Sequence, residues 1–220
     1  MKLQHYYLLL KRNRILYWEQ IRLKFVIVTL VYVMLLLQGR YQQQFYGIFY
    51  GVVQAPNDFV MPVQWFLMML LPSIVVGDSF NQLVKIEYPL LNGVGLGMYV
   101  FSIFQIIAEM LFMFWLLWIL IPGSNHYYWF SLILFLNVNL GTFIFSLISL
   151  FLPPAIVYFI AILLTMMTIA DNNLPILSQF MLSRFDSNLM VNLINTVILI
   201  LIVIILFSCI RLIEFTQIRK

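Results

Sequence analysis

Residues 187–210 read SNLMVNLINTVILILIVIILFSCI, and this stretch contains no charged residue. A helix of about 20 apolar residues, rising about 1.5 Å per residue, crosses the roughly 30 Å hydrocarbon core of a bilayer. The stretch is long enough for such a crossing and is too apolar for the surface of a soluble domain. It therefore predicts a transmembrane helix.

The composition of the whole chain points the same way. Of its 220 residues 64% are hydrophobic and only 9% are charged, whereas an average soluble domain carries about 25% charged residues. The sequence has a single Cys, eight Pro and nine Gly. These counts exclude a disulfide-rich secreted scaffold and a disordered chain, so the composition predicts an integral membrane protein.

The uncharged intervals predict how often the chain crosses the bilayer. From Tyr88 to Ala170 the sequence carries one charged residue, Glu109, and the breaks at 122–125 and 152–154 contain Pro and Gly. Breaks of this kind separate consecutive helices. We therefore expect an all-α membrane protein with six transmembrane helices in one domain, residues 1–220. The predicted spans are 25–39, 59–77, 95–121, 129–151, 155–170 and 187–210.

The Lys and Arg residues predict the orientation. Cytosolic loops of membrane proteins are enriched in these residues. With the N-terminus inside, six spans leave only Arg40 and Arg184 outside. This bias predicts a plasma-membrane protein with both termini in the cytosol. The residues then placed on the cytosolic side are Lys2, Lys11, Arg12, Arg14, Arg22, Lys24, Lys85, Arg211, Arg219 and Lys220.

Two segments outside the spans have a mixed character. Residues 1–24 combine Tyr and Trp with basic residues, a composition typical of a helix that lies in the headgroup layer. The alternative is a basic flank that only sets the topology. Residues 171–188 are half apolar and contain Pro175 and Arg184. This pattern predicts a re-entrant segment on the outer side, where protein or water satisfies its backbone.

The predicted cytosolic loop 77–92 reads GDSFNQLVKIEYPLLN. Asp78 or Ser79 is suited to begin a short helix, and Pro89 limits its length. Such a helix between two spans offers a place where a partner protein pushes on the membrane domain. The residues that recur at helical spacing in it are Phe80, Leu83, Val84 and Glu87.

Sequence motifs for catalysis are not found. The chain has no G-x-x-x-x-G-K-[ST] phosphate loop, no H-E-x-x-H and no G-x-S-x-G, which are the signatures of nucleotide binding, zinc hydrolysis and serine hydrolysis. His5 and His126 have no Cys, Asp or Glu at metal-ligand spacing. We expect a protein that is not itself an enzyme and that uses no cofactor or metal.

Glu109 is the one ionisable residue inside a predicted span. A charge near the bilayer centre costs about 2.5–3.5 kcal/mol or more, so it usually faces protein or water. Two interpretations are open. The carboxyl group lies in a substrate path or at a subunit interface, or it pairs with Asn137 or Asn139 on the next span.

The layout of the chain resembles the permease subunit of a type-two ABC exporter. Residues 3–24 look like the interfacial helix of that family, 77–92 like its coupling helix, and 171–188 like its outer re-entrant element. Lys85, Glu87 and Gly93 are similar to an acidic and basic pattern of the family, although their order differs.

The resemblance implies an ATP-driven exporter of a peptide, a lipid or another amphipathic compound. Antimicrobial-peptide export or resistance is the setting in which small permeases of this kind often serve. The implied partners are cytosolic ABC ATPase subunits, a second permease and membrane lipids, with no nucleic acid. In this mechanism Phe80, Leu83 and Val84 enter a groove of the ATPase, and Lys85 and Glu87 lie at its polar rim.

Other classes remain open on the sequence. A non-transporting immunity or scaffold protein that binds a toxin or a partner has the same composition. A secondary carrier usually shows repeated halves and several intramembrane charges, and the sequence shows no convincing repeat and only Glu109.

Overall fold

The computed structural model of the protein describes residues 2–41, 48–49, 51, 62–90, 94–120, 128–170, 178–185 and 189–217. Parts of the segments discussed above therefore lie outside the described residues. These parts are residue 1, 59–61, 91–93, 121–126, 171–177, 186–188 and the basic residues 219–220.

The described part of the chain is built from helices and contains no strand, which confirms the all-α class. Short helical turns join or follow some of the long helices: α4 (Ser79–Gln82), η1 (Leu83–Glu87), η2 (Tyr88–Leu90), η3 (Ser178–Phe180) and η4 (Leu182–Arg184). The long helices are α1 (Lys2–Tyr41), α3 (Val63–Val76), α5 (Leu96–Leu120), α6 (Tyr128–Phe151), α7 (Pro154–Ala170) and α8 (Leu189–Gln217).

Five described helical stretches are long and apolar enough to cross a membrane. They are His5–Gln38, Val63–Glu87, Leu96–Leu120, Trp129–Phe151 and Leu189–Ile210. A sixth apolar stretch, Pro154–Ile169, is shorter. The limits of α5, α6 and α7 agree within one residue with the predicted spans, because charges, Pro and Gly mark these helix ends in the sequence. The chain is thus a helical protein of the membrane type.

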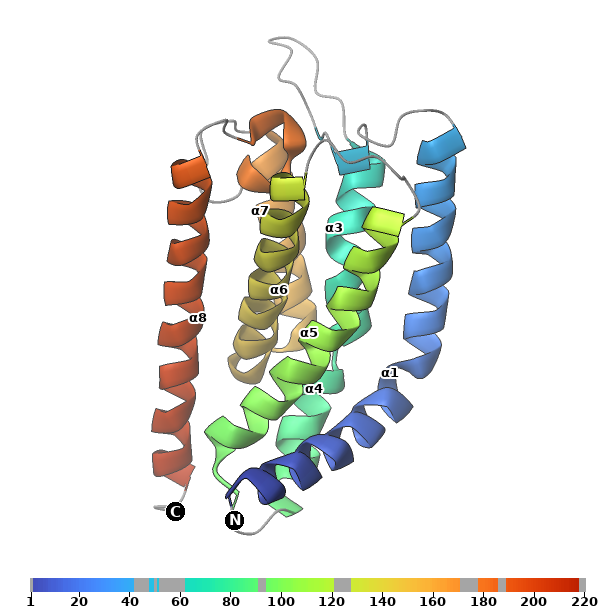
Figure 1. Ribbon diagram of the computed structural model, residues 1–220. Helices are drawn as coiled ribbons and strands as arrows, with labels where there is room; N and C mark the ends of the chain where they lie inside the picture. The colour runs from blue at the N-terminus through green and yellow to red at the C-terminus, as the bar shows by residue number, and fades with distance from the viewer. Residues whose placement is uncertain are drawn as a thin grey trace.

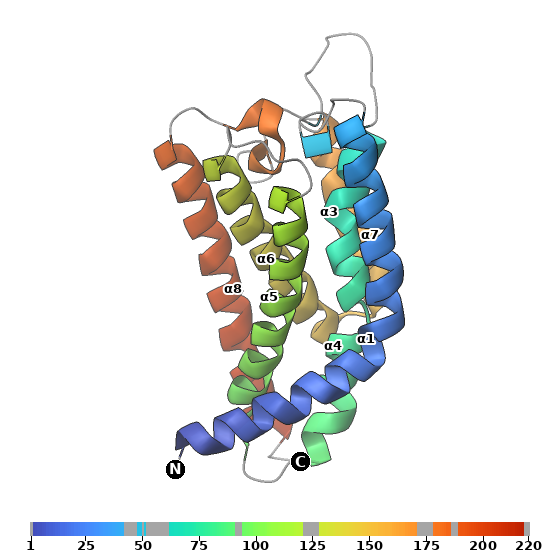
Figure 2. The same ribbon diagram turned by 45° about the vertical axis from the view of Figure 1, so that its right-hand side comes forward.

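The first helix differs from the expectation of a separate interfacial helix over 1–24 followed by a span over 25–39. Both are parts of α1, one continuous helix of 40 residues. Residues 2–38 contain neither Pro nor Gly, so no residue in this stretch ends the helix. The helix instead bends, and its first half runs obliquely beneath the bundle while its second half stands upright (Figure 2).

The long helices alternate in direction, and α6 packs against α3, α5, α7 and α8 (Figure 1). Helix α1 packs against α3 and α5. It begins at the same end of the bundle at which α8 ends, which is the lower end in Figure 1 and is called the lower end below.

Hydrogen bonds and ring contacts join the helices in the interior. Tyr32 on α1 is buried and donates its hydroxyl to the Met68 carbonyl on α3 at 2.7 Å, and its ring lies 4.8 Å from that of Phe114 on α5. Between α6 and α8, Thr196 donates to the Asn137 side chain at 3.1 Å. Helices in a bilayer associate through close packing and polar contacts. Burial of apolar side chains gives no hydrophobic driving force there, because lipid is as apolar as the side chains.

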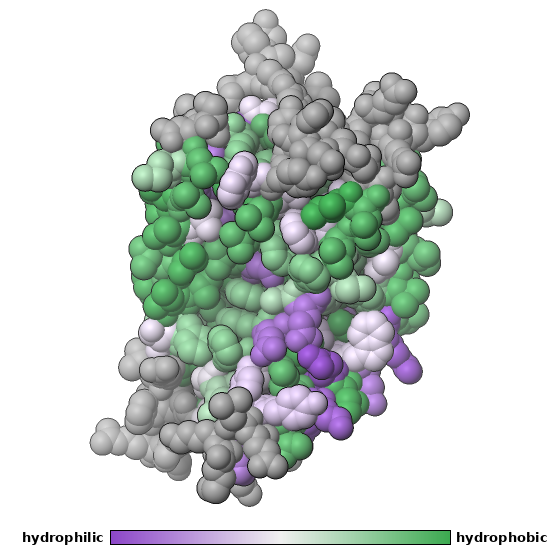
Figure 3. Space-filling model, viewed as in Figure 1, coloured by the Kyte–Doolittle hydropathy of each residue, from purple (hydrophilic) through white to green (hydrophobic). Residues whose placement is uncertain are grey.

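The outward surface is largely apolar above the lower end. Figure 3 shows hydrophobic residues over most of this face, and a hydrophilic patch lower down along the junction of α1 and α5. Most of the exposed side chains described on α8 are aliphatic, which makes a surface suited to contact with lipid chains. They include Ile194, Val197, Leu201, Ile204 and Ile205.

The described part of the predicted re-entrant segment, 178–185, packs on the upper ends of α3 and α7. Trp65 on α3 donates its indole N–H to the Phe180 carbonyl at 2.9 Å. Met181 is buried against Trp65 and Ile169. Arg184 donates to the carbonyls of Thr168 and Ile169 in the last turn of α7, where a cation stabilises the helix end.

Candidate functional site

The turn into the predicted coupling segment is made by Gly77. Helix α3 ends at Val76, and Gly77 has a φ of +42°, a conformation that residues with a Cβ rarely adopt. Its N–H donates to the Ser73 carbonyl at 2.8 Å. The chain then enters α4 and η1 at the lower end, so a short helix is present where the sequence predicts one.

The apolar side chains of this segment are buried in the chain's own core. Phe80 and Leu83 have an exposed fraction of 0%. The Phe80 ring stacks on Phe104 of α5 with 5.6 Å between centroids, and the Leu83 carbonyl accepts a hydrogen bond from Tyr99 at 3.1 Å. The expectation that Phe80, Leu83 and Val84 reach into a groove of a partner is therefore corrected. These side chains attach the segment to the helices above it.

A different face of the segment is open. Gln82, Lys85 and Pro89 are exposed, and Ile86 exposes 62% of its surface although it is aliphatic. The apolar residues at helical spacing were predicted to form the face that contacts a partner, but that face points into the chain's own core. A partner at the lower end would meet Lys85 and Ile86.

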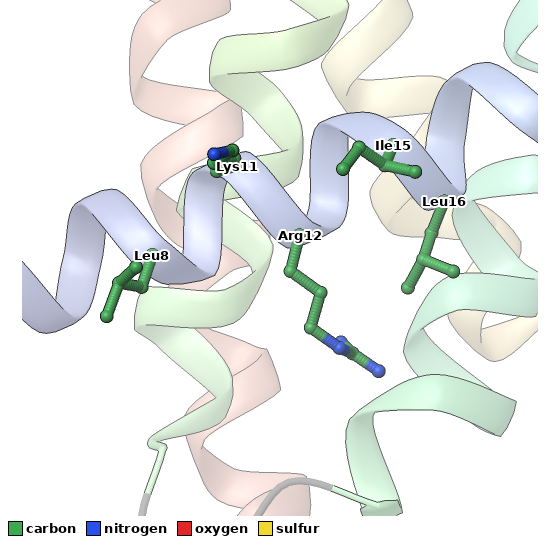
Figure 4. A pocket seen from close by; sticks show the side chains of 5 residues that line it. All are labelled: Leu8, Lys11, Arg12, Ile15 and Leu16. Atoms are coloured by element: carbon green, nitrogen blue, oxygen red, sulfur yellow. The ribbon is translucent and has the colours of Figure 1, made fainter.

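Glu87 faces α1 and does not lie at an outer rim. Its Oε2 atom accepts a hydrogen bond from Arg12 Nη2 at 2.7 Å, and both side chains are partly exposed. Figure 4 shows the Arg12 side chain pointing from α1 toward the neighbouring green helix of the coupling segment. The ion pair therefore joins the coupling segment to the oblique half of α1.

A shallow pocket of about 350 Å³ lies along the same stretch of α1 (Figure 4). It is lined by Leu8, Lys11, Arg12, Ile15 and Leu16. Its lining combines aliphatic surface with two cations, and it lies beside the ion pair to Glu87. The pocket extends the accessible surface of the coupling segment onto α1.

A buried polar contact holds the oblique half of α1 against α5. Asn13 has an exposed fraction of 0% and donates to Ser102 Oγ at 2.7 Å. The Ser102 hydroxyl donates in turn to the Tyr99 carbonyl at 2.7 Å. About two turns nearer the start of α1, Tyr6 donates to Gln105 Oε1 at 2.9 Å.

This contact was not predicted, although the sequence contains a signal for it. Ser102, Gln105 and Glu109 are spaced by three and four residues on an otherwise apolar helix, and residues at that spacing share one helix face. The polar stripe is the side of α5 that α1 covers.

Glu109 pairs with Arg14 of α1. The Arg14 Nη2 atom lies 2.8 Å from both carboxylate oxygens. The two side chains expose 53% and 42% of their surface. The alternative that Glu109 pairs with Asn137 or Asn139 is therefore wrong, because the carboxylate pairs with Arg14 and the two amides have other partners. Asn137 accepts from Thr196, and Asn139 donates to the Phe135 carbonyl of its own helix at 2.8 Å.

The described residues contain no group of three or more His, Cys, Asp or Glu side chains that could hold a metal ion. The chemistry that the lower end offers is ion pairing, hydrogen bonding and apolar contact. It suits binding and the transmission of movement between helices.

Comparison with known proteins gives no relative for this chain. No protein-family model matches it, and no curated protein and no solved structure is significantly similar to it.

Proposed function

We propose that the chain is the membrane-spanning subunit of an ATP-driven exporter. In this proposal the segment 79–90 is the place where a separate cytosolic ATPase pushes. The observation that most supports this proposal is that the segment is attached to both α1 and α5. The Arg12–Glu87 ion pair joins it to α1, and the buried Phe80 joins it to α5, while Lys85 and Ile86 remain open to a partner.

The attachment gives a physical route for coupling. A force on Lys85 and Ile86 acts on a segment whose buried side chains contact α5 and whose ion pair holds α1. Helix α1 is in turn held to α5 by Asn13–Ser102 and by Arg14–Glu109. Displacement of the segment would therefore move α1 and α5 together, which is the kind of packed two-helix unit that shifts in transport cycles.

The proposed topology has six crossings, with α7 as the shortest. Both termini lie in the cytosol, so the lower end of the bundle faces the cytosol. The basic residues of α1 up to Lys24, together with Lys85, gather near this end, as the positive-inside tendency requires. The oblique half of α1 then lies in the inner headgroup layer.

The proposed assembly contains two permease subunits and two ATPase subunits. The cargo is a peptide, a lipid or another amphipathic compound. This part of the proposal rests on the resemblance of the layout to the permeases of type-two exporters and on the small size of the chain.

Photo-crosslinking tests the proposal. A benzoylphenylalanine placed at position 86 of the full chain in its native membrane should crosslink to an ATP-binding cassette protein, which mass spectrometry identifies. The control position is Leu120, an exposed aliphatic residue at the upper end of α5. No such product should form there.

Replacement of Ile86 supplies a second readout. Ile86→Asp should reduce recovery of the ATPase with the purified permease, whereas Ile86→Leu should retain it. Absence of an ATPase both from the crosslink at position 86 and from the purified wild-type protein would reject the exporter. A stoichiometric partner without ATPase sequence would favour the immunity or scaffold alternative.

A further inference from the structure

A groove of about 780 Å³ lies between the concave side of α1 and the face of α5 that carries Glu109. The residues at the α1 bend line one wall, and α5 lines the other. Its lining includes the charged residues Arg14, Glu19, Arg22 and Glu109, and Figure 3 shows the hydrophilic patch along the junction of α1 and α5 meeting apolar surface above it. The groove therefore has the position of the boundary between headgroups and acyl chains.

Four charged side chains line the groove, and only two of them form an ion pair among the described residues. Arg14 and Glu109 neutralise each other in their ion pair. Glu19 and Arg22 also line the groove and are exposed, and neither has an ion-pair partner among the described residues. Residues three apart on a helix lie on the same side. The groove therefore presents one open anion and one open cation side by side.

The remaining lining is apolar or aromatic. Met110 and Met113 line the groove from α5, and Trp18 and Phe25 line it from α1, with 5.3 Å between the centroids of these two rings. Methionine adapts to irregular apolar chains, and tryptophan prefers the zone between headgroups and hydrocarbon. The groove thus combines charged and apolar lining, as does the molecule that would fill it.

We propose that this groove binds a zwitterionic phospholipid of the ethanolamine type from the adjoining leaflet. The phosphate contacts the guanidinium of Arg22, the ammonium contacts the carboxylate of Glu19, and an acyl chain lies over Met110 and Met113. The phosphate and the ammonium of such a headgroup are joined by a short ethylene bridge, so they match two opposite charges on one side of a helix.

Charge complementarity selects this lipid class over two others. An anionic glycerol headgroup satisfies Arg22 but leaves the Glu19 carboxylate beside a phosphate. A cationic amphiphile satisfies Glu19 but leaves Arg22 without an anion. Only a headgroup with both charges pairs each open side chain, and guanidinium groups are well suited to phosphate.

Native mass spectrometry of the full chain in detergent tests the site. The wild-type protein is incubated with phosphatidylethanolamine, phosphatidylglycerol or diacylglycerol of identical acyl chains, and the lipid retained per protein is measured. The wild type should retain phosphatidylethanolamine best. Arg22→Gln should lower retention of both phospholipids about tenfold, the loss expected for a removed hydrogen bond to a charged group.

Two substitutions at Glu19 test the headgroup assignment. Glu19→Gln should abolish the preference for phosphatidylethanolamine over phosphatidylglycerol, and Glu19→Lys should reverse it. A gain of phosphatidylglycerol binding by the Glu19→Lys protein cannot result from misfolding. The control is Lys11→Gln, an exposed cation of α1 in the other pocket, which should retain lipid as the wild type does.

Several outcomes would overturn the proposal. They are equal retention of diacylglycerol by the wild type, a wild-type preference for phosphatidylglycerol, and an Arg22→Gln protein that behaves like Lys11→Gln. The proposal does not rest on the exporter function. Lipid retention is measured without any ATPase, so failure of the lipid experiment and failure of the crosslinking experiment are separate results.

Discussion

Arg14 on α1 and Glu109 on α5 form an ion pair in which one Arg14 nitrogen lies 2.8 Å from each carboxylate oxygen. The two residues are 95 positions apart in the sequence. The pair places the acidic residue of an otherwise uncharged helix against the basic half of α1. It thus gives Glu109 a structural role at the edge of the apolar zone.

Reversal of one charge in this pair should be destabilising, and exchange of both should not. Arg14→Glu places two carboxylates together and should lower the midpoint of thermal unfolding, whereas Arg14→Glu combined with Glu109→Arg should restore most of it. Because both side chains are about half exposed, the coupling energy should be about 0.5–1 kcal/mol. Thermal unfolding in lipid nanodiscs measures it. Strictly additive effects would show that the pair contributes nothing.

The inner and outer faces of the coupling segment should respond differently to truncation. Phe80→Ala removes a fully buried ring and should lower the free energy of unfolding by about 3–5 kcal/mol. Ile86→Ala, on the open face, should change it by less than about 0.5 kcal/mol. Detergent-induced unfolding followed by circular dichroism gives both values. Comparable losses for the two variants would mean that Ile86 is also buried.

Gly77→Ala should be destabilising for two reasons. Its φ of +42° is strained for alanine, and an added Cβ would lie 2.8 Å from the Tyr158 hydroxyl and 3.0 Å from the Ile74 carbonyl. The backbone strain alone is worth about 1–3 kcal/mol. The control is Gly95→Ala, whose Cβ would meet no atom within 4 Å and which should be nearly neutral in the same unfolding assay.

A comparison with Tyr158→Phe separates the two contributions at position 77. Removal of the Tyr158 hydroxyl should relieve the side-chain contact of Gly77→Ala but not its backbone strain. The double variant should therefore recover only part of the lost stability. Full recovery would argue that φ at position 77 is not strained.

Arg184 should stabilise the last turn of α7. Its guanidinium donates to the carbonyls of Thr168 and Ile169, so Arg184→Gln should cost about 1–2 kcal/mol locally. Hydrogen exchange of the amides in the last turns of α7 should become faster. Arg184→Lys keeps the charge near the helix end and should show a smaller increase. An unchanged exchange rate in Arg184→Gln would contradict the assignment.

Helix positions were predictable because their signals are local. The limits of α5, α6 and α7 follow from apolar runs and from the Pro and Gly residues between them. A short helix follows Gly77 as predicted, although Asp78 at its N-cap makes no side-chain hydrogen bond to it. The prediction failed at α1, where a basic and an apolar stretch were separated although neither Pro nor Gly interrupts residues 2–38.

The contacts of the candidate site were not predictable from helical spacing. Phe80, Leu83 and Val84 were correctly placed on one apolar face, but spacing does not show whether such a face meets a partner or the chain's own α5. Similarly, the charge of Glu109 required a partner inside the protein, and the sequence does not show which helix supplies it. The polar stripe of Ser102, Gln105 and Glu109 indicates a covered face without naming the helix that covers it.

The sequence by itself determined the helical membrane class and the approximate limits of most helices, because hydropathy and chain breakers act along a single segment. Only the tertiary structure decided that α1 is bent against α5, that Glu109 pairs with Arg14, and that Lys85 and Ile86 form the open face of the coupling segment. These features depend on how each helix is rotated about its axis relative to its neighbours. That rotation is set by packing among all the helices together.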